Sequence, residues 1–317
     1  MNSLILLALS LNTIYVHKLM KLVNLLMTVL LLIAVTPSVF ACSTCMVGDP
    51  TQSLMGAEKP FRNRLRVSTD FMMRSEELGR DGFNKKVIDE IRQSFNIAYA
   101  PSSRWMLGAN VPYINRQLES FNLAQQEITA PGDITFTFKH FMQQSEFMQK
   151  HMYGFLGGVK LSTAAEQKDS NGIALDFDVQ VGQGADVANL GAWYAHFNFP
   201  FLYYGSASYH VASTGFQEFQ AGNALVFNAT AQYATSYGMA YYAGMEGRSS
   251  KRDIFSGVTD DDSGGNIVFI TPGLVYTIQP ELILNVVLKL PVVERLNGEH
   301  EESTIFSIGV TYDFEIH

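Results

Sequence analysis

The chain is poor in charge, and beyond residue 41 it lacks any long apolar run. Only 16% of its 317 residues are charged, although 47% are apolar. A membrane-spanning helix needs roughly 18 consecutive apolar residues. The nearest approach, at 282–293, is interrupted by Asn285, Lys289 and Pro291. Helical membrane spans are therefore excluded from the part of the chain that follows residue 41.

The start of the chain has the features of a secretory signal peptide. Lys21 precedes an apolar run over 22–35, and a small-residue site ends at Ala41. A basic start, an apolar middle and a small-residue cleavage site are typical of such peptides. A membrane anchor over 4–35 is the alternative, but polar residues interrupt that stretch. We predict a signal peptide that ends at Ala41, with Met20 as an alternative first residue.

Cysteine is scarce as well, and the only two stand directly after this cleavage point, at Cys42 and Cys45. Covalent haem attachment needs a histidine after the second cysteine, and Met46 occupies that place. A lipid anchor on Cys42, a local disulfide in an oxidising periplasm and capture of a soft metal ion by the two thiolates stay open. We predict a disulfide or a metal-binding pair, and no cofactor.

What the sequence does have is alternation, clearest at its end, where apolar and mostly polar residues alternate strictly over 303–314. A period of two places the two sets on opposite faces of a strand. The segment resembles the closing strand of bacterial outer-membrane barrels, in which the apolar face meets lipid. That resemblance implies recognition by the barrel-assembly machinery through the strand that ends at Phe314. Three residues follow Phe314, whereas many such proteins stop at the aromatic residue.

Alternation and turn residues together predict an all-β, transmembrane, antiparallel up-and-down barrel of about twelve strands, with fourteen as the alternative count. Short joins fall on the periplasmic side and longer loops on the extracellular side. A soluble β-sandwich of this length would more often divide into two domains, and no linker is present. We assign 1–41 to the signal peptide, 42–61 to a periplasmic segment and 62–317 to the barrel. The predicted strands are 62–76, 87–100, 102–116, 131–143, 151–163, 184–197, 201–213, 222–234, 237–248, 266–277, 281–291 and 303–314.

Charged side chains at the lumen-facing positions form the predicted solute pathway, and most of them are basic. One interpretation is a pathway that favours anionic or carboxylated solutes. The other is that acidic and basic side chains pair across the lumen and fill it. The pathway residues are Arg64, Arg66, Asp70, Arg92, Lys139, Lys160, Glu246 and Lys289.

The middle of the chain carries short motifs at 158–162, 175–178 and 182–186, which read Gly-Val-Lys-Leu-Ser, Leu-Asp-Phe-Asp and Gly-Gln-Gly-Ala-Asp. They resemble the outer-membrane proteins labelled "MetA-pathway of phenol degradation", in which a Gly-Val-Lys-Leu-Pro-Thr-Gly-like strand precedes a Gly-Thr-Gly-Ser-x-Asp-like loop. The resemblance covers roughly residues 88 to 314. It implies passage of small hydrophobic or aromatic molecules across the outer membrane.

A constriction loop would follow from the last of these motifs. Gly182 and Gly184 would let the loop fold tightly back into the pore, and Asp186 would bind a lumen arginine. A catalytic role is not expected, because neither His210 with Ser213 nor His196 with Asn198 matches the serine–histidine pattern of outer-membrane phospholipases.

The sequence thus predicts a channel in the outer membrane of a Gram-negative bacterium, with lipid and a small solute as partners. Nucleic acid is not expected for a secreted chain of net charge −8. The alternative is a non-transporting barrel that anchors periplasmic redox or metal-handling proteins through the segment with Cys42 and Cys45.

Overall fold

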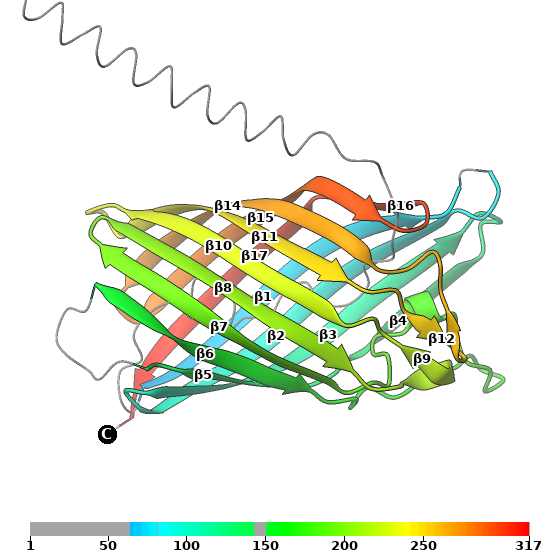
Figure 1. Cartoon of the computed structure of the whole chain (residues 1–317), viewed down its shortest axis with the longest axis horizontal. Helices are drawn as coiled ribbons and strands as arrows, with labels where there is room; N and C mark the ends of the chain where they lie inside the picture. The colour runs from blue at the N-terminus through cyan, green and yellow to red at the C-terminus, as the bar shows by residue number, and fades with distance from the viewer. Residues whose placement is uncertain (1–63, 81, 143–149, 317) are drawn as a thin grey trace, which may run out of the picture. The chain divides into compact units, whose positions relative to one another are not determined.

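The structure, a computed structural model, describes residues 64–80, 82–142 and 150–316. These residues form an antiparallel sheet of fourteen strands, in which β4 and β16 are short additions to a ring of twelve. The ring is closed, because β1 pairs both with β2 and with β17 at the end of the chain (Figure 1). The predicted twelve-stranded barrel is confirmed. Its strands are β1 (Arg64–Leu78), β2 (Lys86–Ser102), β3 (Trp105–Ser120), β5 (Thr135–His140), β6 (His151–Lys160), β7 (Val187–Asn198), β8 (Phe201–Ala212), β10 (Ala224–Ala234), β11 (Met239–Ser250), β14 (Gly265–Gln279), β15 (Leu282–Leu296) and β17 (Ile305–Glu315).

The two ends of the barrel differ in the length of their connections, as predicted. At one end, called here the turn end, most connections are short, for example 199–200 between β7 and β8 and 280–281 between β14 and β15. At the other, the loop end, they are long, and the longest runs over 161–186 between β6 and β7. Figure 1 shows the C-terminus at the turn end. No helix among the described residues is long and apolar enough to span a membrane.

The two faces of the barrel wall also follow the predicted alternation. On β17, Val310, Tyr312 and Phe314 are 40% exposed or more, whereas Thr311 and Asp313 between them are nearly buried. The exposed set faces outward and the buried set inward, because the inside of a closed barrel is shielded by the opposite wall.

One predicted strand is shorter than expected, and an additional strand precedes it. The strand predicted over 131–143 is observed as the shorter β5, and the stretch before it, predicted as a connection, forms a further strand, β4 (Gln125–Pro131). β4 pairs with 113–119 of β3 and β5 with 105–110. The break falls at Gly132, whose N–H donates to Pro112 O at 2.9 Å. A Cβ at Gly132 would lie 2.9 Å from Ile114 Cδ1 and 3.0 Å from Pro112 Cγ, so a larger residue would require these side chains to shift.

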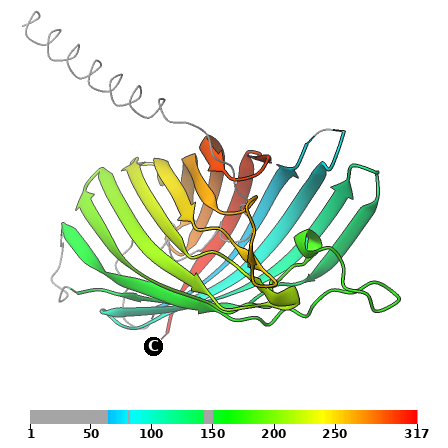
Figure 2. The same ribbon diagram turned by 45° about the vertical axis from the view of Figure 1, so that its right-hand side comes forward.

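Small elements cover the loop end. β16 (His300–Glu302) extends the pairing of β1, and a separate sheet of three short strands joins two loops (Figure 2). Two single-turn 3-10 helices, η2 and η3, lie in the loops after β6 and β8. The remaining short elements are β9 (Phe219–Gln220), β12 (Ile254–Phe255), β13 (Val258–Thr259), η2 (Phe177–Val179) and η3 (Phe216–Glu218).

Candidate functional site

The longest loop, residues 161–186, packs against the inner wall of the barrel at the loop end, and we call it the inner segment. Val179, which has no exposed surface, packs against Ile88 of β2 and Leu118 of β3. Val181 packs against Ile114 of β3. These wall residues share the inward face of their strands, since they are buried and alternate with more exposed neighbours. The apolar contacts therefore hold the segment inside the barrel.

Polar contacts attach the same segment to the wall. The Arg116 guanidinium donates to the backbone carbonyl of Gln180. Lys86 Nζ lies 2.9 Å from Asp176 Oδ2 and 2.7 Å from Asp178 Oδ2. Burial raises the pKa of Asp178, and the neighbouring Lys86 ammonium opposes that shift. A charge-assisted bond and an ion pair thus reinforce the apolar contacts.

The glycines of the predicted constriction lie where the inner segment leaves the wall. A Cβ at Gly182 would lie 2.6 Å from Ala164 Cβ. Gly184 has a φ of +69°, and a Cβ there would lie 2.5 Å from Phe216 Cδ1. Both positions therefore need glycine, Gly184 for its backbone conformation as well as for space.

Asp186 does not bind a lumen arginine, and that prediction is wrong. Its side chain is exposed, and Oδ1 accepts from the Ser162 backbone N–H at 2.8 Å. This bond lowers the pKa of Asp186. The Asp186 N–H donates to Ser213 Oγ at 2.9 Å. Asp186, which precedes β7, is thus bonded to a residue that follows β6 and to one that follows β8. The arginine that holds the segment is Arg116, and the group of the segment that it binds is the backbone carbonyl of Gln180, not a carboxylate.

The predicted pathway residues lie on the inward face, and most of them are paired there. Arg64 and Arg66 both contact Asp313, with Arg66 Nε 2.7 Å from Asp313 Oδ1. Lys289 Nζ lies 2.8 Å from Glu246 Oε2. The remaining contacts are Lys160 with Asp133 at 3.5 Å, Arg92 with Glu90 at 2.6 Å, and Asn96 donating to Asp70 at 2.7 Å. Of the two interpretations of these charges, the structure agrees with pairing, but the pairs join the same or nearby strands along the wall and do not cross the lumen.

A buried ionic network at the loop end was missed from the sequence. Arg74 lies 3.1 Å from Glu76 and 3.5 Å from Glu302. Arg116 and Arg92 both contact Glu90, 1% of which is exposed. Glu76 and Glu90 fall on inward positions of their strands, so the alternation could have revealed them. Their presence offsets much of the predicted basic excess.

Part of this network has the composition of a metal site. Ligand atoms of Glu76, His300 and Glu302 lie within 4.8 Å of one another, and all three residues are buried. The Arg74 guanidinium, however, already contacts both carboxylates, and His300 Nε2 lies 2.6 Å from Glu76 Oε1. An arginine therefore supplies the positive charge that a cation would bring.

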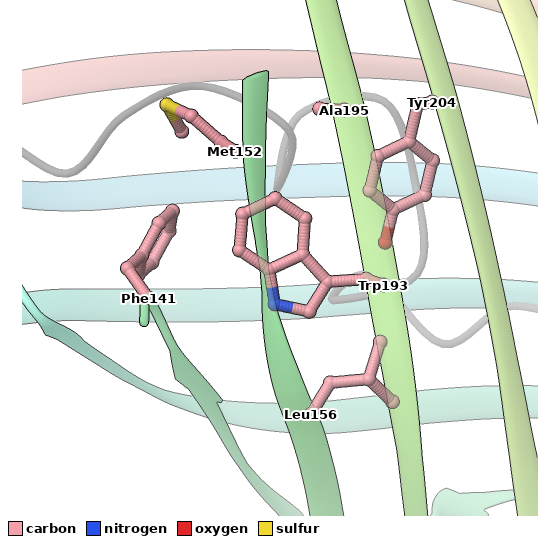
Figure 3. Close-up of a cluster of buried hydrophobic side chains, with 6 residues drawn as sticks. All are labelled: Phe141, Met152, Leu156, Trp193, Ala195 and Tyr204. Atoms are coloured by element: carbon pink, nitrogen blue, oxygen red, sulfur yellow. The ribbon is translucent and has the colours of Figure 1, made fainter. Parts of the chain in front are cut away.

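At the turn end the inner wall is apolar and aromatic. A cluster from β5 to β8 surrounds Trp193, and Phe141 meets that ring edge-on at 4.8 Å between centroids (Figure 3). Lys139, which is 1% exposed, places Nζ 4.1 Å from the Trp193 ring and 4.7 Å from the Tyr204 ring. The aromatic faces stabilise its charge inside the barrel. The cluster comprises Phe141, Met152, Leu156, Trp193, Ala195 and Tyr204.

One serine–histidine contact lies on the inner wall. His210 Nε2 lies 2.9 Å from Ser208 Oγ, so its partner is not Ser213, the serine weighed in the sequence. The charge that acts on His210 is that of Arg248, whereas a catalytic histidine is oriented by a carboxylate. The serine and the histidine are within hydrogen-bond distance of each other, but a carboxylate that would orient the histidine is not seen among the described residues, so the pair does not form a catalytic triad.

Cys42 and Cys45, the predicted disulfide or metal pair, lie outside the described residues, as does the predicted signal peptide.

No protein-family model and no curated protein matches this chain. Its structure is similar to that of the COG4313 outer membrane channel from Pseudomonas putida F1, with a TM-score of 0.65 and 12% identity over 81% of this chain and 98% of that one. The translocator domain of the autotransporter NalP from Neisseria meningitidis superposes with a TM-score of 0.49 and 12% identity, over 82% of this chain and 91% of that one. The P. putida toluene transporter TodX gives 0.41 and 9%, over 81% and 91%.

Of these similarities, only that to the COG4313 channel supports a conclusion. At so low an identity it concerns the fold alone. The chain has the fold of an outer-membrane β-barrel channel.

Proposed function

We propose that this protein is an outer-membrane channel through which small hydrophobic or aromatic solutes pass, with the inner segment as the constriction. The observation that carries the proposal is the packing of a 26-residue loop, 161–186, against the inner wall of a closed barrel. A loop held there by Arg116 and Lys86 narrows the lumen at one level. In pores of this kind, width and the groups that line the narrowest level decide which solutes pass.

The balance of charge inside the barrel supports neutral over anionic solutes. Arg64, Arg66, Lys160 and Lys289 each contact a carboxylate. A paired charge exerts little net attraction on a passing anion. Beyond the constriction, the inner wall around Trp193 is apolar and aromatic, an environment that suits an apolar or aromatic molecule. The resemblance to the proteins labelled "MetA-pathway of phenol degradation" agrees with the same class of solute.

A location in the outer membrane of a Gram-negative cell would explain why the outer surface of the barrel is apolar. Large apolar side chains such as Leu190, Tyr209 and Leu225 are 46% exposed or more and cover the outside of the wall. Lipid would bury this surface. The closing strand β17, with Phe314 near its end, is the segment through which the assembly machinery would insert the barrel.

The proposal is tested by refolding the protein in detergent and inserting it into planar bilayers and liposomes. We expect discrete conductance, and faster entry of a neutral phenol than of the matching benzoate. Gly184→Val should change conductance, because the side chain would strike Phe216 and displace the segment. Gly172→Val is the matched control: it lies in the same segment at a φ of +80°, but its Cβ would have nothing within 4 Å.

A barrel that folds, as judged by heat-modifiable gel migration, but neither conducts nor admits solute would contradict the proposal. That result would favour the alternative of a periplasmic anchor that acts through Cys42 and Cys45. Serine substitutions at both cysteines would then abolish function, whereas a channel should conduct without them.

A further inference from the structure

Two histidines lie side by side on the outer surface of the barrel, at the turn end. His151 begins β6, and His196 lies near the end of β7 as its direct cross-strand partner. Their Nδ1 atoms are 3.3 Å apart, although the ring centroids are 4.5 Å apart. The Nδ1 edges of the two rings are therefore the edges that approach each other.

This spacing matches that of two nitrogen ligands on one metal ion. Imidazole nitrogens bind Zn²⁺ at about 2.0–2.1 Å, so two of them at a tetrahedral angle lie about 3.3 Å apart. A ring nitrogen has one lone pair when it carries no proton, and both Nδ1 atoms offer theirs when the protons are on Nε2. The Tyr194 hydroxyl, 2.6 Å from His151 Nδ1, fits that tautomer of His151, since it can donate to the bare nitrogen.

The pair is also fixed in place and lies at the rim of the wall, because His151 is the first residue of β6 and His196 is two residues from the end of β7. Both histidines belong to one antiparallel ladder, and Tyr203 of β8 stacks on His196 with centroids 6.2 Å apart. His151 is exposed and His196 is half-buried. Because the ligands are held by strands, little side-chain freedom is lost when an ion binds.

We infer that His151 and His196 bind a borderline divalent transition-metal ion, such as Zn²⁺ or Cu²⁺, through their Nδ1 atoms. The other coordination positions are open to water. Imidazole suits both ions, and Cu²⁺ should bind more tightly than Zn²⁺ at the same ligands. The site lies outside the barrel and away from the inner segment, so it does not depend on the proposed channel.

Isothermal titration of the full chain in detergent with ZnCl₂ tests this inference. Because thiolates also bind zinc, the comparison is made with Cys42→Ser and Cys45→Ser as the background. We expect that background to bind one Zn²⁺ per chain, and His151→Gln or His196→Gln to abolish this binding. His140→Gln, at an outward-facing histidine of β5, is the matched control and should leave it unchanged.

Copper gives an independent signature. In the same background, electron paramagnetic resonance of bound Cu²⁺ should show coupling to two imidazole nitrogens, reduced to one by either glutamine substitution. Heat-modifiable migration verifies that each variant is folded; the substituted side chains point outward, so folding should be unaffected. Failure of the background to bind Zn²⁺, or binding by either histidine variant equal to that of the background, would overturn the inference.

Discussion

Lys86 Nζ lies 2.7 Å from Asp178 Oδ2, so the loop end of β2 is joined to the segment that packs inside the barrel. The contact links residues 92 positions apart in the chain. It is reinforced by Asp176, which accepts from the same ammonium at 2.9 Å. One cation therefore holds two carboxylates of the inner segment against the wall.

Lys86→Gln should loosen the inner segment without unfolding the barrel. The side chains are 31% and 20% exposed, so the lost ion pair should cost only about 0.5–1 kcal/mol. We expect larger or more variable single-channel conductance. Lys85→Gln is the matched control, because Lys85 pairs with Glu77 of β1. Identical conductance for the two variants would show that Lys86 does not help to hold the constriction in place.

Asp186 should make the attachment of the inner segment sensitive to acid. Its pKa in the folded protein lies below the ordinary value of 3.8, because the Ser162 N–H stabilises the carboxylate. The stability it contributes is therefore complete above pH 3.8 and is lost as the pH falls through the lowered pKa. Thermal unfolding of the wild type and of Asp186→Asn should converge as the pH is lowered from 6 to 2. A constant difference over that range would contradict the assignment.

Alternation revealed the barrel because each strand of its wall separates two environments. Val310 and Thr311 differ in polarity, and the structure places them on opposite faces. This pattern is local, and so are the turn residues, which is why strand number and loop lengths could be predicted. The break between β4 and β5 at Gly132 could not, because it depends on the close approach of Pro112 and Ile114 from a neighbouring strand.

The site was less accessible to sequence reasoning, since its key contacts are long-range. Arg116 binds the backbone carbonyl of Gln180, a group that every residue has and that no motif marks. Glu302 contacts Arg74 because β16, near the end of the chain, pairs with β1 at its start. The predicted glycines at 182 and 184 do lie at a close approach, but the partner expected for Asp186 was wrong, because its side chain points to the surface.

Trp193→Ala should destabilise the barrel and disturb the aromatic wall. The ring is 3% exposed, contacts Phe141 and lies under the Lys139 ammonium. Truncation of a buried tryptophan typically costs about 3–5 kcal/mol, and here it also removes a face that stabilises a buried cation. We expect a marked fall in the unfolding temperature and slower phenol entry into liposomes. Trp193→Phe, which keeps a ring, should restore much of both; equal losses in the two variants would argue against a role for the aromatic face.

Val310→Arg should test whether the outer surface of the barrel meets lipid. Val310 is 41% exposed on the outward face of β17, between Gly309 and Thr311 of the inner face. An arginine on the lipid face of a barrel costs about 2–4 kcal/mol at the bilayer midplane, and less near the interface. Val258→Arg, at a 68% exposed valine of β13 in the loops, is the control. Folding into liposomes, measured by heat-modifiable migration across a urea series, should be weakened by Val310→Arg and unchanged by Val258→Arg. If both variants folded like the wild type, the outward face of β17 would not contact hydrocarbon.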